Sequence, residues 1–144
     1  MNDPRAYPDR PFLAVSAAIV RDGRVLVVRR ARAPAEGIFT LPGGVVEAGE
    51  TLVAAVVREI REETALDIAP VALAGHREFI GRDDTGRIER HFVILAFAAR
   101  WLAGEPVLSE ELAEARWIDP ADLTQLRTTE GLADIIAAAY EKLR

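Results

Sequence analysis

The chain has 144 residues, 50% of them hydrophobic, and a formal net charge of −5 at pH 7. This is the size of one ordinary domain, and the acidic balance argues against a general affinity for nucleic acid polymers or anionic membranes. The absence of cysteine excludes disulfide bonds, thiolate metal sites and a cysteine nucleophile, and it fits a cytoplasmic location.

The N-terminal segment MNDPRAYPDR is polar and contains two prolines, and no hydrophobic region of signal-peptide length follows it. No stretch approaches the roughly 20 apolar residues that a membrane helix needs. We therefore expect a soluble cytoplasmic protein with a flexible N-terminal arm over residues 1–10 and a single domain over residues 11–144.

Two strands joined by a tight turn open this domain. The runs FLAVSAAIV (residues 12–20) and RVLVVRR (residues 24–30) are predominantly apolar, and the Asp-Gly pair between them is a strong hairpin signal. A loop follows, and then the run LPGGVVEAGE (residues 41–50). Its glycines predict a tightly turned backbone.

A helix is predicted from an N-cap at Thr51 to about Ala65. Its apolar residues form one stripe at 100° per residue: Val53, Val56, Val57 and Ile60. Three carboxylates occupy the neighbouring arc: Glu59, Glu62 and Glu63. Like charges at this spacing cost an isolated helix roughly 0.2–0.5 kcal/mol per pair. A cluster of acids beside the packed edge of the helix therefore indicates a positively charged partner.

The rest of the chain alternates strands with turns and ends in a helix. Strands are expected over residues 68–81, 88–100 and 114–119, with a turn over 82–87. The last helix is expected over residues 129–143, with these residues facing the core: Leu132, Ile135, Ile136, Ala139, Tyr140 and Leu143. This order predicts an α/β fold in which a mixed sheet has a helix on each face.

A fixed pattern links the glycine run to the acidic helix. Gly44, Glu50 and the run Arg58-Glu59-Ile60-Arg61-Glu62-Glu63 fit G-x5-E-x7-R-E-U-x-E-E, where U is a bulky aliphatic residue. The pattern, with LPGG before it, resembles the signature of the Nudix hydrolases. That signature continues with x-G-U, whereas this chain has Ala65 at the glycine position. A left-handed alanine at the helix end would cost about 1 kcal/mol; alternatively, the helix ends differently.

The resemblance implies a Nudix-type α/β/α sandwich, with a mixed sheet between helices, that hydrolyses a nucleoside diphosphate linked to another moiety X. Carboxylate oxygens suit Mg²⁺ or Mn²⁺. The implied ligands are Glu59, Glu62, Glu63 and the backbone carbonyl of Gly43 or Gly44. Arg58 completes this catalytic set, because it is expected to pair with Glu50 and position the carboxylates. A free acid near the helix N-terminus is the alternative for Glu50.

A further carboxylate is expected from the run SEELAEARW, residues 109–117, as a base or a metal ligand. The run RWLAGEP, followed by acids and a strand that contains tryptophan, resembles the MutT branch of the family. Counting back from Trp117, Glu111 occupies the corresponding place, and Glu110 is the alternative.

Three further residues are substrate-binding candidates. Arg30, at the end of the second strand, is expected to meet phosphate oxygens, while Phe39 and Phe79 are expected to stack on a base or ribose. The alternative for Arg30 is a strand-end arginine in water. The MutT branch has an asparagine that reads the purine where this chain has Thr129, so specificity for oxidised guanine is not predicted.

A nucleoside triphosphate, ADP-ribose or a nucleotide sugar is therefore the expected partner, and dimerisation is left open. The alternative function is a catalytically inactive Nudix-like module that senses nucleotides or binds proteins. Such modules usually lose the acids of the motif, and this chain retains Glu59, Glu62 and Glu63.

Overall fold

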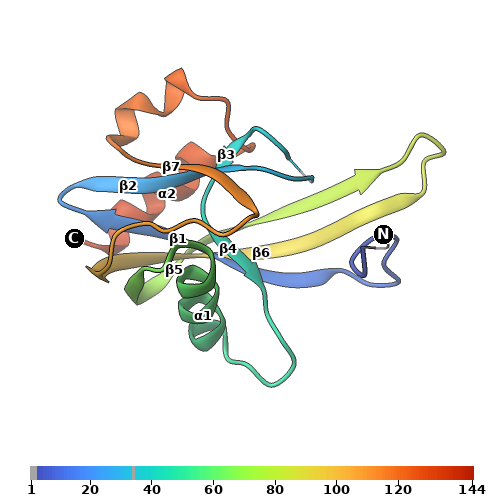
Figure 1. The fold of residues 1–144 in the computed structure, drawn as a ribbon, viewed down its shortest axis with the longest axis horizontal. Helices are drawn as coiled ribbons and strands as arrows, with labels where there is room; N and C mark the ends of the chain where they lie inside the picture. The colour runs from blue at the N-terminus through green and yellow to red at the C-terminus, as the bar shows by residue number, and fades with distance from the viewer. Residues whose placement is uncertain (1–2, 34) are drawn as a thin grey trace.

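The computed structural model describes residues 3–33 and 35–144. Within these residues a mixed sheet lies between two α-helices, α1 (Leu52–Thr64) and α2 (Leu132–Lys142) (Figure 1). The strands are β1 (Phe12–Arg21), β2 (Arg24–Arg30), β3 (Phe39–Thr40), β4 (Gly43–Val45), β5 (Asp67–Arg82), β6 (Ile88–Ala103) and β7 (Leu112–Ile118). A 3-10 helix, η1 (Pro120–Gln125), follows β7. In the part of the chain described, no helix has the length and hydropathy to cross a bilayer.

The main strand order is β3-β2-β1-β6-β5, in which β1 runs parallel to β6 and the other pairs are antiparallel. The second edge of β1 has two partners. Val20 near its end pairs with Val25 of β2, whereas Ser16 lies opposite Gly43 of β4. This change of partner brings the β4 glycines to the middle of the molecule, beside α1.

The predicted hairpin and helix cap are both present. Asp22 (φ 51°) and Gly23 (φ 77°) have the two positive φ angles of a type I′ turn, which joins β1 to β2. The Thr51 hydroxyl accepts a hydrogen bond from the Ala54 N–H at 3.1 Å, so Thr51 is the N-cap of α1.

Each face of the sheet has its own core. In β2, Leu26 and Val28 belong to the cluster that includes the buried face of α1, whereas Val25 and Val27 belong to the cluster that includes α2. This alternation is the period of two expected of a strand that is buried on both faces. The predicted arrangement of one helix on each face is therefore confirmed.

Helix α2 begins three residues later than its periodicity predicts. The Thr129 N–H donates to the carbonyl oxygen of Phe39 at 3.1 Å, as part of a parallel bridge between Thr128 and Phe39 of β3. Gly131, at φ 79°, then serves as the N-cap, and the first helical residue is Leu132. This long-range pairing explains why the periodicity alone misplaced the start.

Helix α1 ends in a left-handed alanine. Ala65 has φ 63° and ψ 14°, and its N–H donates to the Arg61 carbonyl at 3.0 Å. Glycine adopts this conformation without the clash of a Cβ atom, so Ala65→Gly is expected to raise the free energy of unfolding by about 1 kcal/mol. Urea unfolding would measure the change.

The matched control is Ala54→Gly, at an exposed position inside α1. Glycine lowers stability there by about 1 kcal/mol, because it is a poor helix former. If both substitutions destabilised the protein equally, the conformation at Ala65 would not be the source of strain.

Candidate functional site

The site is built where the glycines of β4 meet the acidic edge of α1. A Cβ atom on Gly44 would lie 2.2 Å from the Cδ and Oε2 atoms of Glu59. A Cβ atom on Gly43 would lie 2.0 Å from the Val15 carbonyl oxygen. Only glycine at both positions lets the backbone approach the carboxylate and strand β1 this closely.

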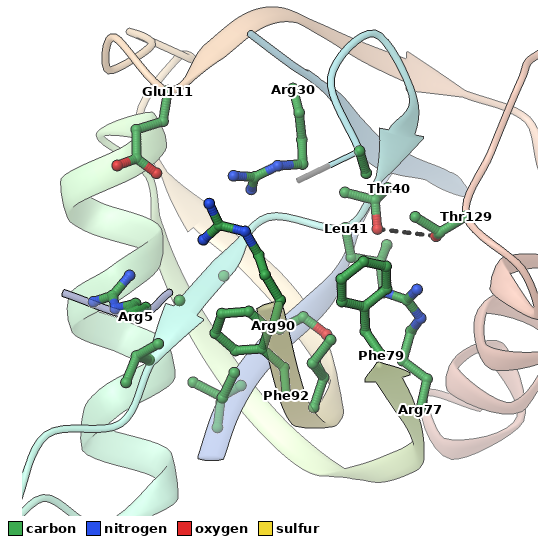
Figure 2. A pocket seen from close by; sticks show the side chains of 18 of the residues that line it. Arg5, Arg30, Thr40, Leu41, Arg77, Phe79, Arg90, Phe92, Glu111 and Thr129 are labelled. Carbon is green, nitrogen blue, oxygen red and sulfur yellow. Dashed lines mark hydrogen bonds between the residues drawn. The ribbon is translucent and has the colours of Figure 1, made fainter. Parts of the chain in front are cut away.

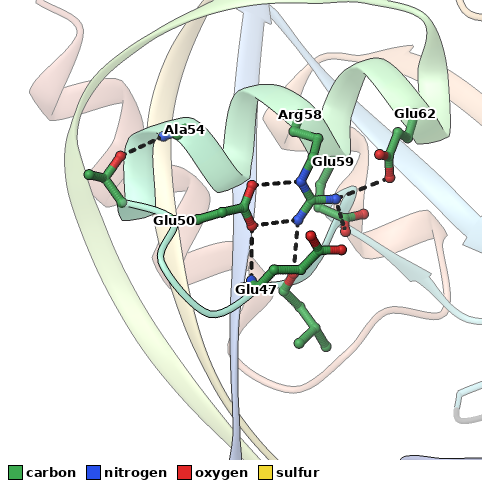
Figure 3. A network of polar contacts seen from close by, with 8 residues as sticks. Glu47, Glu50, Ala54, Arg58, Glu59 and Glu62 are labelled. Atoms are coloured by element: carbon green, nitrogen blue, oxygen red, sulfur yellow. Dashed lines mark hydrogen bonds and ion pairs between the residues drawn. The ribbon is translucent and has the colours of Figure 1, made fainter.

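Arg58 ties the loop before α1 to the helix (Figure 3). Its Nε and Nη2 atoms each donate to one carboxylate oxygen of Glu50 at 2.7 Å, and Nη2 also donates to the Val45 carbonyl at 3.2 Å. The two bonds from Arg58 to Glu50, with a further one from the Glu47 N–H, hold the pKa of Glu50 at about 2. The predicted Glu50–Arg58 ion pair is therefore present in bidentate form.

The same guanidinium bridges two of the three clustered acids. Nη1 of Arg58 donates to Glu59 at 2.8 Å and to Glu62 at 3.1 Å. Burial raises the pKa of Glu59, and Arg58 partly offsets that effect. Arg58 thus offsets part of the negative charge on the acidic arc of the helix, through Glu59 and Glu62 but not Glu63.

Glu63 is the buried member of the cluster, with 7% of its surface exposed. Its Oε1 atom accepts a hydrogen bond from the Gly43 N–H at 2.9 Å. Burial raises the pKa of Glu63 to about 7; the Gly43 bond opposes this, the charge of Glu59 adds to it, and smaller effects come from Arg30 and Glu111. Without a cation, the Glu63 carboxyl therefore holds its proton up to near neutral pH.

These acids fit a divalent cation by their chemistry. Among residues 3–33 and 35–144, no three acidic or histidine side chains converge on one point, because Arg58 holds Glu59 and Glu62 while Glu63 turns to Gly43. Yet hard carboxylate oxygens on one helix edge suit Mg²⁺ or Mn²⁺. A buried carboxyl with a raised pKa also gains most from a nearby cation, since the cation favours its ionised form.

A cavity of about 410 Å³ opens beside this acidic edge. Its charged lining residues are Arg5, Arg30, Arg32, Arg77, Arg90, Asp3 and Glu111. Figure 2 shows Glu111 and Arg30 near α1, whereas Phe79 and Arg77 lie at the other end beside Thr129. The cavity thus has a highly charged end near the acids and a more aromatic end beneath α2.

Four of the predicted site residues line this cavity: Arg30, Gly43, Phe79 and Glu111. Glu110 does not line the cavity; its side chain is 87% exposed and pairs with Arg32 at 3.2 Å, which favours Glu111 as the loop carboxylate. Phe39 is 6% exposed and belongs to the core under α2, with Arg116 over its ring. We therefore assign Phe39 a core role and do not retain it as a substrate-stacking residue.

The sequence patterns did not point to four arginines of the cavity: Arg5, Arg32, Arg77 and Arg90. The last two had a detectable signal, because Arg77 alternates with Phe79 on β5 and Arg90 alternates with Phe92 on β6. Residues two apart on a strand point to the same face. Burial lowers the pKa of Arg77, which stands near the hydrogen-bonded hydroxyls of Thr40 and Thr129 (Figure 2).

Comparison with known proteins gives a consistent result. The family model described as the NUDIX domain matches residues 10–139. An ADP-ribose pyrophosphatase of Methanocaldococcus jannaschii is 37% identical over 81% of this chain and 66% of its own length, so the chain spans just under two thirds of that relative. A putative 8-oxo-dGTP diphosphatase 2 of Mycobacterium tuberculosis is 38% identical, over 76% of this chain and 82% of the relative.

The solved structures include a MutT NUDIX hydrolase from Burkholderia pseudomallei with the same fold. Its TM-score is 0.77 at 32% identity, and the match covers 90% of this chain and 98% of that protein. The α/β/α architecture expected from the sequence is thereby confirmed.

Proposed function

This chain belongs to the Nudix hydrolase family, and on that premise we propose that it is a pyrophosphohydrolase that uses Mg²⁺ or Mn²⁺ to cleave a nucleoside diphosphate linked to a moiety X. The observation that carries the proposal is the meeting of the acidic edge of α1 with an arginine-lined cavity. An acidic protein that binds a phosphorylated substrate needs local cations. The cavity arginines supply some of them, and a metal held by the acids would supply the rest.

The residues that would hold the cation are Glu59, Glu62, Glu63 and the backbone carbonyl of Gly43. When bound, the cation would polarise a phosphoryl group, lower the pKa of a bound water and neutralise the leaving group. Arg58 acts through these residues, because its bonds to Glu50 fix the guanidinium that orients Glu59 and Glu62.

Glu111 is the proposed acceptor for the proton of the attacking water. It lies at the cavity edge, close enough for its charge to act on Glu63. Arg30 lines the same end of the cavity and is the proposed partner of the phosphate oxygens. Near the acidic helix, a carboxylate could accept the proton of the water that attacks phosphorus, and a guanidinium could stabilise the negative charge on the phosphate oxygens.

The aromatic end of the cavity would receive the base or X. Phe79 offers a ring face, and Arg77 and Thr129 offer hydrogen-bond donors (Figure 2). The relatives are named for ADP-ribose and 8-oxo-dGTP, which both contain a nucleoside diphosphate. We therefore propose a nucleoside triphosphate, ADP-ribose or a nucleotide sugar as the substrate class.

A substrate panel tests this proposal. Nucleoside triphosphates, ADP-ribose, nucleotide sugars and dinucleoside polyphosphates would be incubated with Mg²⁺ or Mn²⁺, and phosphate would be measured with and without a coupling phosphatase. We expect turnover of at least one class and none in excess EDTA. If no compound were cleaved but nucleotides still bound, the chain would be a nucleotide-sensing module instead.

Mg²⁺ is also expected to stabilise the fold. A ligand that binds only the folded state adds about 2.7 kcal/mol when its concentration is 100 times its Kd. Thermal unfolding in rising MgCl₂ should therefore show an increasing Tm, with NaCl of equal ionic strength as the control. A flat magnesium titration, or an equal shift in NaCl, would count against a cation site in the folded protein.

A further inference from the structure

The N-terminal arm forms part of the lining of the cavity. Asp3, Pro4 and Arg5 are among the cavity-lining residues, although they lie far in sequence from the acidic helix. The sequence predicts a flexible arm over residues 1–10. The structure differs for residues 3–7, which have defined contacts on the hairpin formed by β5 and β6, beside the N-terminus in Figure 1.

Tyr7 is the main anchor of the arm. Its N–H donates to the Glu89 carbonyl at 2.8 Å, and its hydroxyl donates to Asp83 Oδ2 at 2.8 Å. The Arg87 guanidinium lies 4.2 Å from the centre of the Tyr7 ring, within the range of a cation–π contact. Tyr7 also has φ 52°, a conformation that a residue with a large side chain adopts only when its surroundings hold it there.

A second anchor lies closer to the cavity. The carboxylate of Asp3 accepts a hydrogen bond from the Arg90 guanidinium of β6, and its other oxygen accepts one from the Arg5 N–H at 2.9 Å. Asp3 therefore neutralises Arg90 and at the same time fixes the backbone of Arg5. The two anchors lie on either side of Arg5 and determine where its side chain enters the cavity.

The Arg5 guanidinium is positioned to bind an anion in the cavity. It lies beside α1 at the charged end of the cavity, where Arg30 and Arg90 also point (Figure 2). It is close enough for its charge to act on the Glu59 carboxylate. Across the described residues, its guanidinium makes no hydrogen bond or ion pair with another side chain. Arg90 and Arg32, in contrast, are paired with Asp3 and Glu110.

We propose that Arg5 is a substrate-binding residue that the N-terminal arm brings to the diphosphate, and that Tyr7 is the positioning residue that holds the arm in place. This inference rests on the proposed function, because it assigns a group to the phosphates of the same substrate. A guanidinium binds phosphate oxygens through two parallel hydrogen bonds. The arm would therefore add one guanidinium to the phosphate site that the rest of the cavity forms.

Variants of the full chain test this inference by substrate kinetics and by calorimetric titration of ADP in EDTA, where no metal takes part. Arg5→Ala is expected to raise KM and the Kd for ADP about tenfold or more, since a hydrogen bond to a charged group is worth about 1.5–3 kcal/mol. Its kcat should stay within about twofold, because the acids of α1 are unchanged. Tyr7→Phe loses only the bond to Asp83 and should show a smaller rise in both constants.

The matched control is Arg10→Ala, which removes an arginine of the same arm whose side chain is 84% exposed and meets only Asp9 at 3.9 Å among the described residues. It should leave KM, kcat and Kd unchanged. The inference is overturned if Arg5→Ala behaves like Arg10→Ala, or if the wild type does not bind ADP. The wild type could also cleave no substrate while Arg5→Ala still weakens ADP binding. That outcome would refute the proposed hydrolase activity and keep the proposed role of Arg5 in phosphate binding.

Discussion

Replacing Glu63 by glutamine is expected to lower Mg²⁺-dependent kcat/KM by more than about 100-fold, because changes to residues that merely orient metal ligands already cost 10- to 100-fold. Glutamine keeps the shape of the side chain and an oxygen that can accept the 2.9 Å hydrogen bond from Gly43. It removes the negative charge that would hold the cation. The reaction would be measured on the best substrate of the panel.

Glu110→Gln is the matched control for this loss. Glu110 is a nearby loop acid, but it pairs with Arg32 on the outer surface and is expected to be dispensable. Full activity of the Glu63 variant would remove Glu63 from the proposed set of ligands. A comparable loss in the Glu110 variant would make Glu110 the loop carboxylate in place of Glu111, or would show that the effect reflects the overall negative charge of this region.

The Glu63→Gln variant also gives a test that needs no enzyme activity, because its free energy of unfolding should depend on pH differently from that of the wild type. The folded-state pKa of Glu63 is about 7, against an ordinary value of 4.5, so the folded chain binds one more proton than the unfolded chain between these values. Stability is therefore greatest below pH 4.5 and falls as pH rises to 7, by on the order of 3 kcal/mol for this group. Glutamine does not ionise, so the variant should lack this fall.

Urea unfolding in EDTA at pH 4 to 8 would measure both proteins. We expect similar stability at pH 4 and a variant more stable than the wild type at pH 8. Adding Mg²⁺ at pH 8 should stabilise the wild type more than the variant, because the cation favours the ionised carboxylate. Parallel pH profiles of the two proteins in EDTA would contradict the burial of an ionisable group at Glu63.

Short-range patterns predicted the centre of this site well. The cap at Thr51 and the Glu50–Arg58 pair follow from residues within about two turns of one helix or the loop before it. The left-handed end at Ala65 is one of the two alternatives that the motif left open. Each has a local physical cause that a sequence displays directly. The Asp22-Gly23 turn belongs to the same class, since the turn type depends on two residues.

The parts of the site that escaped prediction depend on contacts between distant segments. Arg5 reaches the cavity because Tyr7 and Asp3 bind residues far along the chain, among them Asp83, 76 positions beyond Tyr7. Thr129 lies outside helix α2 because its N–H donates to the carbonyl oxygen of Phe39. Phe39 illustrates the converse error: an aromatic residue before the motif resembled a stacking platform, and only the packing under α2 assigned it to the core.

Substitution of the two glycines of β4 is the second change with a large expected effect. Alanine at Gly44 is expected to lower activity, whereas alanine at Gly43 is expected to lower stability. Gly44→Ala would place its methyl group 2.2 Å from the carboxylate of Glu59, at the end of a flexible side chain. We expect that side chain to swing away, so the fold is retained while kcat/KM falls by about 10- to 100-fold, as for other changes that misplace a metal ligand. Enzyme kinetics and the Tm of the same preparation would be compared.

Gly43→Ala is expected to act on the fold itself. Its methyl group would lie 2.0 Å from the Val15 carbonyl oxygen and 2.7 Å from Ser16 Cα, and backbone atoms of a central strand cannot move aside cheaply. Overpacking of this kind costs about 1–3 kcal/mol or more. Gly75→Ala serves as the control for both variants, because its methyl group would meet only Ile135 at an ordinary 3.7 Å. If Gly44→Ala lost stability and kept its activity, Glu59 would be a structural residue, and the cation would have to be held without it.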